Sequence, residues 1–289
     1  MNREQLTGQG AVLATALLWS TSGLFIKLLE WHPIVISGMR SIVAGIFLLA
    51  VRLIVPPPKG IKNPRFPFWA SAFCYALTML TFVIANKLTT TANAVMLQYG
   101  APVWAALLGW ALVREKPRWE QWGALVLVFA GLFLFFRDDL GSGAFTGDIM
   151  AFISGIFFGA NSVFLRMQKD GTPRDAMLMA HWVNAAICVP FIFMHPPVFT
   201  VSSSLTLLYM GALQVGLAAI LFSYGIQLIS AIKAMLTATI EPVLSPVWVL
   251  IVTGERPSSA ALAGGTVIII AILASSLIGN YRETRMQPI

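Results

Sequence analysis

Residues 91–113, TANAVMLQYGAPVWAALLGWALV, form an apolar stretch that contains no charged side chain. A helix needs about 20 mainly apolar residues to cross the hydrocarbon core of a bilayer, so this stretch is long enough to span it. A related pattern recurs 140 residues later in residues 231–253, AIKAMLTATIEPVLSPVWVLIVT, where Pro242 falls in register with Pro102. The two stretches together predict a membrane protein with an internal repeat.

The composition extends this prediction to the whole chain. Of the 289 residues, 57% are hydrophobic and 11% are charged, whereas soluble domains carry about 25% charged residues. A soluble globular protein, a disordered protein and a nucleic-acid-binding domain are therefore disfavoured. The apolar runs are continuous rather than alternating, which disfavours a β-barrel. We expect an all-α membrane protein with ten transmembrane helices, over residues 9–28, 34–55, 67–86, 91–113, 119–136, 147–166, 175–195, 205–228, 232–253 and 259–280.

The positions of the basic residues predict the orientation of these spans. If the N-terminus is cytoplasmic, fourteen of the nineteen Lys and Arg residues fall on the cytoplasmic side, as the positive-inside rule requires. We therefore expect a multi-pass protein of the inner membrane with both termini in the cytoplasm. The net charge of +7 then reflects orientation, and no nucleic-acid partner is expected.

The repeat continues outside the two quoted stretches. Pro33 matches Pro173 at the same offset, and Trp19 matches Phe158 at an offset of 139. The expected units are residues 1–139 and residues 140–289, each with five helices around a shared central cavity. An odd number of spans inverts the second unit in the membrane. Inverted repeats are typical of secondary transporters, whose halves expose a central site to each side in turn.

Several motifs carry a family resemblance. The segment from Tyr99 to Glu115 resembles the fourth helix of the drug/metabolite transporter superfamily, and the segment from Glu241 through Gly254 to Gly264 resembles its ninth and tenth helices. The resemblance covers essentially the whole chain and is specific for the ten-helix EamA-type exporters, with most similarity to the YddG-type amino-acid exporters. It implies export of small metabolites, including aromatic amino acids, by a monomer that carries both repeats.

Two charged side chains are candidates for substrate contact. Glu241 is the one carboxylate expected deep in the bilayer, where such groups are costly and usually functional. It could bind a substrate ammonium or carry a coupling proton; alternatively, it is protonated and bonded to backbone freed by Pro242 and Pro246. Arg40, early in its span, is a possible partner for a substrate carboxylate, with snorkelling to the lipid headgroups as the alternative.

Prolines and polar or aromatic side chains predict the rest of the site. Pro102, Pro242 and Pro246 remove helix hydrogen bonds and are expected hinges, although proline is also common in membrane helices. For each wall residue, simple packing between helices is the alternative. The expected substrate-binding residues are Trp19, Ser20, Tyr75, Thr78, Met79, Phe82, Gln98, Tyr99, Phe158, Asn161, His181, Trp182, Gln214 and Tyr224.

The sequence contains no Walker A, HExxH or GxSxG pattern, so we expect no enzyme activity, no cofactor and no metal site. The expected function is export of amino acids or similar small metabolites by alternating access, with the lipid bilayer and the small-molecule substrate as partners. Export of drugs, nucleosides or sugars is one alternative. A membrane-embedded enzyme or scaffold is an alternative of another class.

Overall fold

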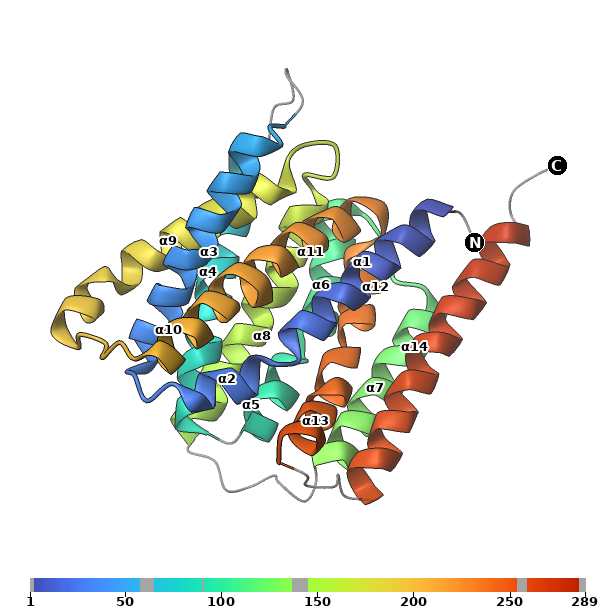
Figure 1. Ribbon diagram of the computed structural model, residues 1–289. Helices are drawn as coiled ribbons and strands as arrows, with labels where there is room; N and C mark the ends of the chain where they lie inside the picture. Colours follow the sequence, from blue (N-terminus) through green and yellow to red (C-terminus); the bar gives the residue numbers. More distant parts are fainter. Residues whose placement is uncertain (1–2, 58–64, 90, 137–144, 254–258, 286–289) are drawn as a thin grey trace.

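The computed structural model describes residues 3–57, 65–89, 91–136, 145–253 and 259–285, and the secondary structure in these ranges is helical (Figure 1). The helices of the first half are α1 (Arg3–Trp19), α2 (Ser22–Leu28), α3 (Pro33–Ile54), α4 (Arg65–Leu88), α5 (Thr91–Gln98), α6 (Ala101–Leu108), the π-helical η1 (Gly109–Val113) and α7 (Trp119–Phe136). Those of the second half are α8 (Phe145–Arg166), α9 (Pro173–Met194), α10 (Val201–Leu208), the π-helical η2 (Tyr209–Leu217), α11 (Ala218–Leu228), α12 (Ala231–Ala238), α13 (Ile240–Thr253) and α14 (Ser259–Arg285).

The all-helical expectation is confirmed for the described residues. Seven helical stretches among them are long and apolar enough to cross a membrane, namely Arg3–Leu28, Pro33–Ile54, Arg65–Leu88, Asn93–Val113, Phe145–Arg166, Pro173–Met194 and Val201–Leu228. Two further apolar helices, Trp119–Leu134 and Leu262–Ser275, are shorter. The count of ten spans stays a prediction.

Local sequence explains where several helices begin. Pro33 and Pro173 each occupy the first turn of α3 and α9, a position where the missing N–H of proline costs nothing and its fixed φ favours the helix. Thr200 accepts from the Ser203 backbone N–H in a capping box at the start of α10, which satisfies an otherwise unpaired donor.

The halves interdigitate rather than forming separate bundles. The most extensive pairings join α4 to α8, α7 to α14, α3 to α9 and α1 to α11, and each joins one helix of the first half to one of the second. Figure 1 shows α7 and α14 lying side by side along their length, and it places the start of α1 and the end of α14 at the same end of the bundle.

Helices α3 and α9 run antiparallel. Arg52, near the end of α3, pairs with Asp175 in the first turn of α9 at 3.0 Å. At the opposite end, His32 before α3 stacks on His195 after α9 with ring centroids 4.6 Å apart. Helix α3 therefore lies along α9, and it also packs against η2.

Candidate functional site

Two helices are broken at matching positions. The helix of residues 91–113 is interrupted at Tyr99 and Gly100, between α5 and α6, and the helix of residues 231–253 is interrupted at Thr239, between α12 and α13. Pro102 and Pro242 follow the breaks, each in the first turn of the next helix segment. Two of the three prolines predicted to be hinges thus lie directly after helix breaks. Pro246 belongs to α13, and its side chain lies outside the described residues.

The breaks free backbone carbonyls, because proline lacks the N–H that would bond the carbonyl four residues earlier. The carbonyl of Ala238, four residues before Pro242, accepts a hydrogen bond from the Tyr99 hydroxyl at 3.0 Å. The carbonyl of Gln98 packs against Gly155 of α8, where an added Cβ would lie 2.7 Å from that oxygen. The first break therefore supplies the donor that satisfies the second.

Glu241 lies at the second break, in the first turn of α13, with only 8% of its surface exposed. Its carboxyl oxygen Oε2 lies 2.5 Å from the same Tyr99 hydroxyl. That hydroxyl has one proton, so it donates to an ionised Glu241, or it donates to Ala238 while a protonated Glu241 donates to its oxygen. Tyr99 can therefore hold this carboxyl group in either protonation state.

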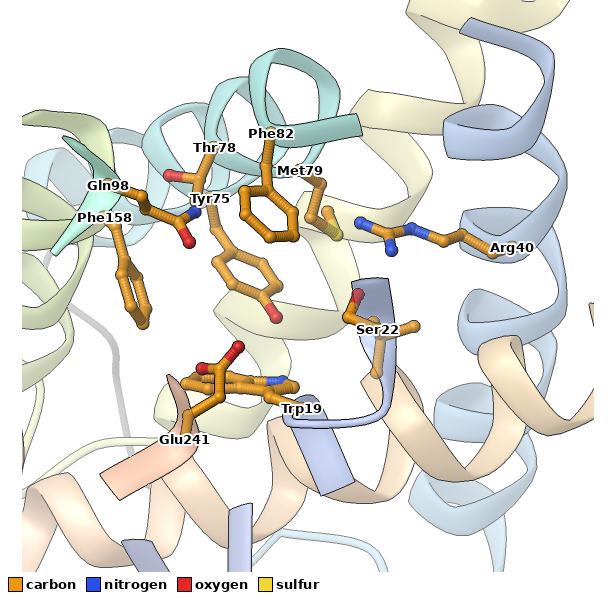
Figure 2. A pocket seen from close by; sticks show the side chains of 11 residues that line it. Trp19, Ser22, Arg40, Tyr75, Thr78, Met79, Phe82, Gln98, Phe158 and Glu241 are labelled. Atoms are coloured by element: carbon orange, nitrogen blue, oxygen red, sulfur yellow. The ribbon is translucent and has the colours of Figure 1, made fainter. Parts of the chain in front are cut away.

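A cavity of about 50 Å³ lies between these elements (Figure 2). Its lining comes from α1, α2, α3, α4, α5, α8, η2 and α13, which places it where the two halves meet. The lining residues are Trp19, Ser22, Arg40, Tyr75, Thr78, Met79, Phe82, Gln98, Phe158, Val215 and Glu241. This volume is below the roughly 300–1,000 Å³ that is usual for small-molecule sites, so the cavity must widen to hold a small-molecule ligand.

Aromatic rings form much of the cavity wall. Trp19 and Phe158, which match each other in the repeat, meet edge to face with centroids 5.3 Å apart. Trp19 also packs against Phe222 of α11 at 5.3 Å. Figure 2 shows the Tyr75 hydroxyl pointing into the cavity between the Glu241 carboxyl and Ser22. Such a wall favours a ligand with an apolar or aromatic body.

Gln98 and Thr78 are fixed by α8. The Gln98 amide nitrogen donates to the Ser154 hydroxyl at 2.9 Å, and that hydroxyl donates to the Thr78 carbonyl at 3.1 Å. The helix segment before the first break is therefore attached to α4 through α8, which positions both side chains at the cavity.

Comparison with known proteins identifies the family. The model of the EamA-like transporter family matches residues 6–137 and residues 145–277. The chain belongs to the EamA-like transporter family. It is therefore a membrane transporter, and the cavity between its halves is the site to consider for the transported solute.

Two relatives of this EamA-family chain are similar over nearly their full length. The uncharacterized transporter YwfM of Bacillus subtilis (strain 168) is 26% identical over 282 residues, covering 94% of this chain and 95% of the relative. An uncharacterized transporter of Archaeoglobus fulgidus is 23% identical over 267 residues, covering 92% and 95%. A protein of known crystal structure has the same fold, with a TM-score of 0.80 at 20% identity over 96% of this chain and 98% of that one.

Nine predicted residues of the EamA-family chain line the cavity together: Trp19, Arg40, Tyr75, Thr78, Met79, Phe82, Gln98, Phe158 and Glu241. Tyr99 lies behind this wall, bonded to Glu241. Two lining residues were not among those predicted to bind substrate, Ser22 and Val215. Ser22 follows the predicted Ser20 by two positions, whereas Val215 carries no chemical signal and reaches the cavity through the π-helical turn of η2.

The remaining predicted residues lie elsewhere. The Ser20 hydroxyl accepts from the Trp248 indole at 2.7 Å, and the Asn161 amide oxygen accepts from Ser71 at 2.9 Å. The Gln214 amide donates to Thr21 at 3.2 Å. Each of these polar groups bridges two helices in the described structure.

Three more predicted residues flank the cavity or face outward. His181 is fully buried between α3 and α4, edge-on to the Tyr75 ring with centroids 5.7 Å apart. Trp182 packs against Gly45 of α3. Tyr224 is 48% exposed and does not line the cavity. In the described part of the chain, no group of three or more His, Cys, Asp and Glu side chains could hold a metal ion.

Proposed function

We propose that this transporter exports amino acids, including aromatic and other apolar ones, or similar small metabolites, across the inner membrane by alternating access. The observation that carries the substrate class is the composition of the cavity wall. It combines one carboxyl group, Glu241, and one guanidinium group, Arg40, with aromatic and apolar side chains. A few polar groups in a mainly apolar pocket fix the orientation of a small ligand.

The packing supports two inverted repeats, residues 1–139 and 140–289, as the moving parts. Pro33 and Pro173 begin matching helices in the proposed repeats, and these helices, α3 and α9, run antiparallel. The pairings of α1 with α11 and of α8 with α4 are the same contact with the two halves exchanged. Both relations are expected of units related by a two-fold axis in the membrane plane.

The described helices are compatible with ten spans if three further helical segments cross the membrane in addition to the seven long ones. Two are the shorter apolar helices in α7 and α14. The third is the broken pair of α12 and α13, which together extend from Ala231 to Thr253. An even number of spans places both ends on one side, in keeping with the shared end of α1 and α14 in Figure 1. The positive-inside rule makes that side cytoplasmic.

Arg166, at the end of α8, joins the two repeats at one end of the bundle. Its Nε donates to Glu115 at 2.8 Å, and its Nη1 donates to the carbonyls of Ile226 and Gln227 at 3.1 and 2.8 Å. These contacts tie the connection before α7 in the first repeat to the end of α11 in the second. In our proposal they must break when the cavity opens to the cytoplasm.

Counterflow from proteoliposomes tests the proposal. Vesicles preloaded with one unlabelled solute would be offered labelled amino acids, nucleosides, sugars and cationic drugs in turn. We expect uptake of labelled phenylalanine, tryptophan and apolar amino acids. Uptake confined to another class would replace the proposed substrate, and absence of flux for every solute would favour the enzyme or scaffold alternative. Flux without response to an imposed proton gradient would indicate a passive facilitator.

A further inference from the structure

Arg40 is a buried cation with hydrogen-bond donors that lack a partner in the described structure. Only 2% of its surface is exposed, and its Nε and Nη1 atoms are buried without a hydrogen-bond partner in the described structure. Figure 2 shows the guanidinium group pointing from α3 into the cavity beside Met79. A buried charge that lacks a partner is strongly destabilising, so the arrangement indicates a place for an anionic group that is supplied from outside the protein.

The burial of Arg40 and the packing of α3 argue against the snorkelling alternative. Gly38 packs against Cys188 of α9, where an added Cβ would lie 2.5 Å from the Cys188 Cβ. On the other side, an added Cβ at Gly211 of η2 would lie 3.0 Å from the Arg40 carbonyl oxygen and 2.4 Å from the Cβ of Val43. With α3 enclosed this closely by two elements, the guanidinium is held at the cavity rather than at the lipid headgroups.

The second charged group enters from the other side of the cavity. Figure 2 shows the Glu241 carboxyl and the Arg40 guanidinium pointing inward from opposite sides, with the Tyr75 hydroxyl between them. No ion pair joins the two among the described residues, because Arg40 keeps two unpaired nitrogens and Glu241 bonds to Tyr99. A ligand with separated opposite charges can therefore satisfy both groups at once.

We propose that the cavity recognises a zwitterion by both charges, with the carboxylate bound to Arg40 and the ammonium bound to Glu241. This inference rests on the proposed function and specifies it. A planar guanidinium suits a carboxylate because it offers two parallel donors. The rings of Trp19, Phe82 and Phe158 then receive the apolar side chain. Free α-amino acids meet all three requirements, whereas amino-acid amides, amino-acid esters and simple organic cations leave one charged group unpaired.

The consequence is a strict requirement for both ends of the substrate. A site built to bond a polar group rejects the analogue that lacks it far more strongly than it rejects a missing methylene. We expect L-phenylalanine amide, which lacks the carboxylate, and 3-phenylpropionate, which lacks the ammonium, each to bind about 100-fold or more weakly than L-phenylalanine.

The test measures binding of these three compounds to the purified full-length transporter by calorimetry, with flux measured separately. Arg40→Gln should abolish the preference for phenylalanine over its amide and leave the preference over 3-phenylpropionate. Glu241→Gln should abolish the preference for phenylalanine over 3-phenylpropionate and leave the preference over the amide. Arg40→Lys keeps the charge but loses the bidentate geometry, so it should retain part of the preference. Arg52→Gln, which removes an ion pair at the helix ends, is the matched control and should change neither.

The outcomes separate this inference from the proposed function. Wild-type protein that transports phenylalanine but binds its amide equally well overturns the two-ended recognition and leaves amino-acid export standing. Protein that neither binds nor transports any amino acid overturns both. If Arg40→Gln does not fold, the wild-type comparison of the three compounds and the Arg40→Lys variant still decide the matter.

Discussion

The two helix breaks are the most informative comparison within this molecule. Residues 97–102 read LQYGAP and residues 237–242 read TATIEP, so both end in the proline that follows a break. They differ in chemistry: Tyr99 stands opposite Thr239 in the repeat alignment, and Ala101 stands opposite Glu241. The structure brings the breaks together, since Tyr99 bonds to the Ala238 carbonyl and to Glu241. At these matching breaks, the first half thus supplies the hydroxyl group that holds the carboxyl group, and the second half supplies the carboxyl group itself.

Packing explains why the carboxyl group is in the second half. Ala101 is fully buried, and an added Cβ at Gly159 of α8 would lie 2.6 Å from its carbonyl oxygen. Ala101 is not among the residues that line the cavity. Glu241 faces the cavity instead, so the two halves can share a backbone plan while only one carries a charge.

The largest effect is expected from removing the charge that distinguishes the second break. Glu241→Gln keeps the shape and loses the ionisable group, and a lost contact with a charged partner typically costs about 2–5 kcal/mol. We expect counterflow of phenylalanine to fall about 100-fold or more, with the remaining flux insensitive to an imposed proton gradient. Asp175→Asn, at the helix ends, is the control. Unchanged flux and unchanged pH dependence in Glu241→Gln would remove both roles proposed for this residue.

The next effect concerns the packing of the first break. Gly155→Ala places a methyl group 2.7 Å from the Gln98 carbonyl oxygen, and overpacking of this kind costs about 1–3 kcal/mol. The variant should melt at a lower temperature in detergent and show weaker transport. Gly10→Ala on α1, where an added Cβ meets nothing within 4 Å, should be neutral or slightly stabilising. Equal melting temperatures for the two variants would contradict the close packing of α8.

A smaller effect is expected from the contact that joins the breaks. Tyr99→Phe removes the donor to the Ala238 carbonyl and to Glu241, and a lost hydrogen bond costs about 1 kcal/mol. We expect a modest loss of thermal stability and a changed pH profile of transport. Tyr224→Phe, at a half-exposed position, should leave both unchanged. A stability loss without any change in the pH profile would reduce Tyr99 to a structural role.

The smallest effect is expected at His32, which lies just before α3 and stacks on His195 just after α9. These two helices are the other matched pair in the proposed repeats. Burial, and then the nearby charge of His195, hold the pKa of His32 below its ordinary value of 6.5. The folded protein therefore binds fewer protons than the unfolded chain below that pH, and stability should fall as the pH drops through this range. His32→Gln should narrow the difference between melting temperatures at pH 7.5 and pH 5.5. If the difference between the two melting temperatures is the same in His32→Gln and in the wild type, protonation of His32 does not contribute to the pH dependence of stability.

The sequence predicted much of the site because charge and proline are rare in apolar helices. Glu241 and Arg40 stood out against their surroundings, and both line the cavity. Tyr75, Thr78, Met79 and Phe82 recur at helical spacing in the sequence, and all four line the cavity. The same reasoning could not place Tyr224, which is half-exposed. The sequence of an apolar helix does not show whether a tyrosine lies on the side that faces the cavity or on the side that faces outward.

The sequence by itself determined the class of protein and its helical character, and its matched prolines, Pro102 and Pro242, lie next to the two breaks. These follow from local properties, since hydrophobic length sets a span and proline removes a hydrogen bond wherever the chain goes. The tertiary structure decided which groups meet. That Tyr99 of one half satisfies Ala238 of the other, and that two nitrogens of Arg40 find no partner among the described residues, depends on contacts between residues far apart in the chain. Such contacts are fixed by how helices pack, and no local pattern encodes them.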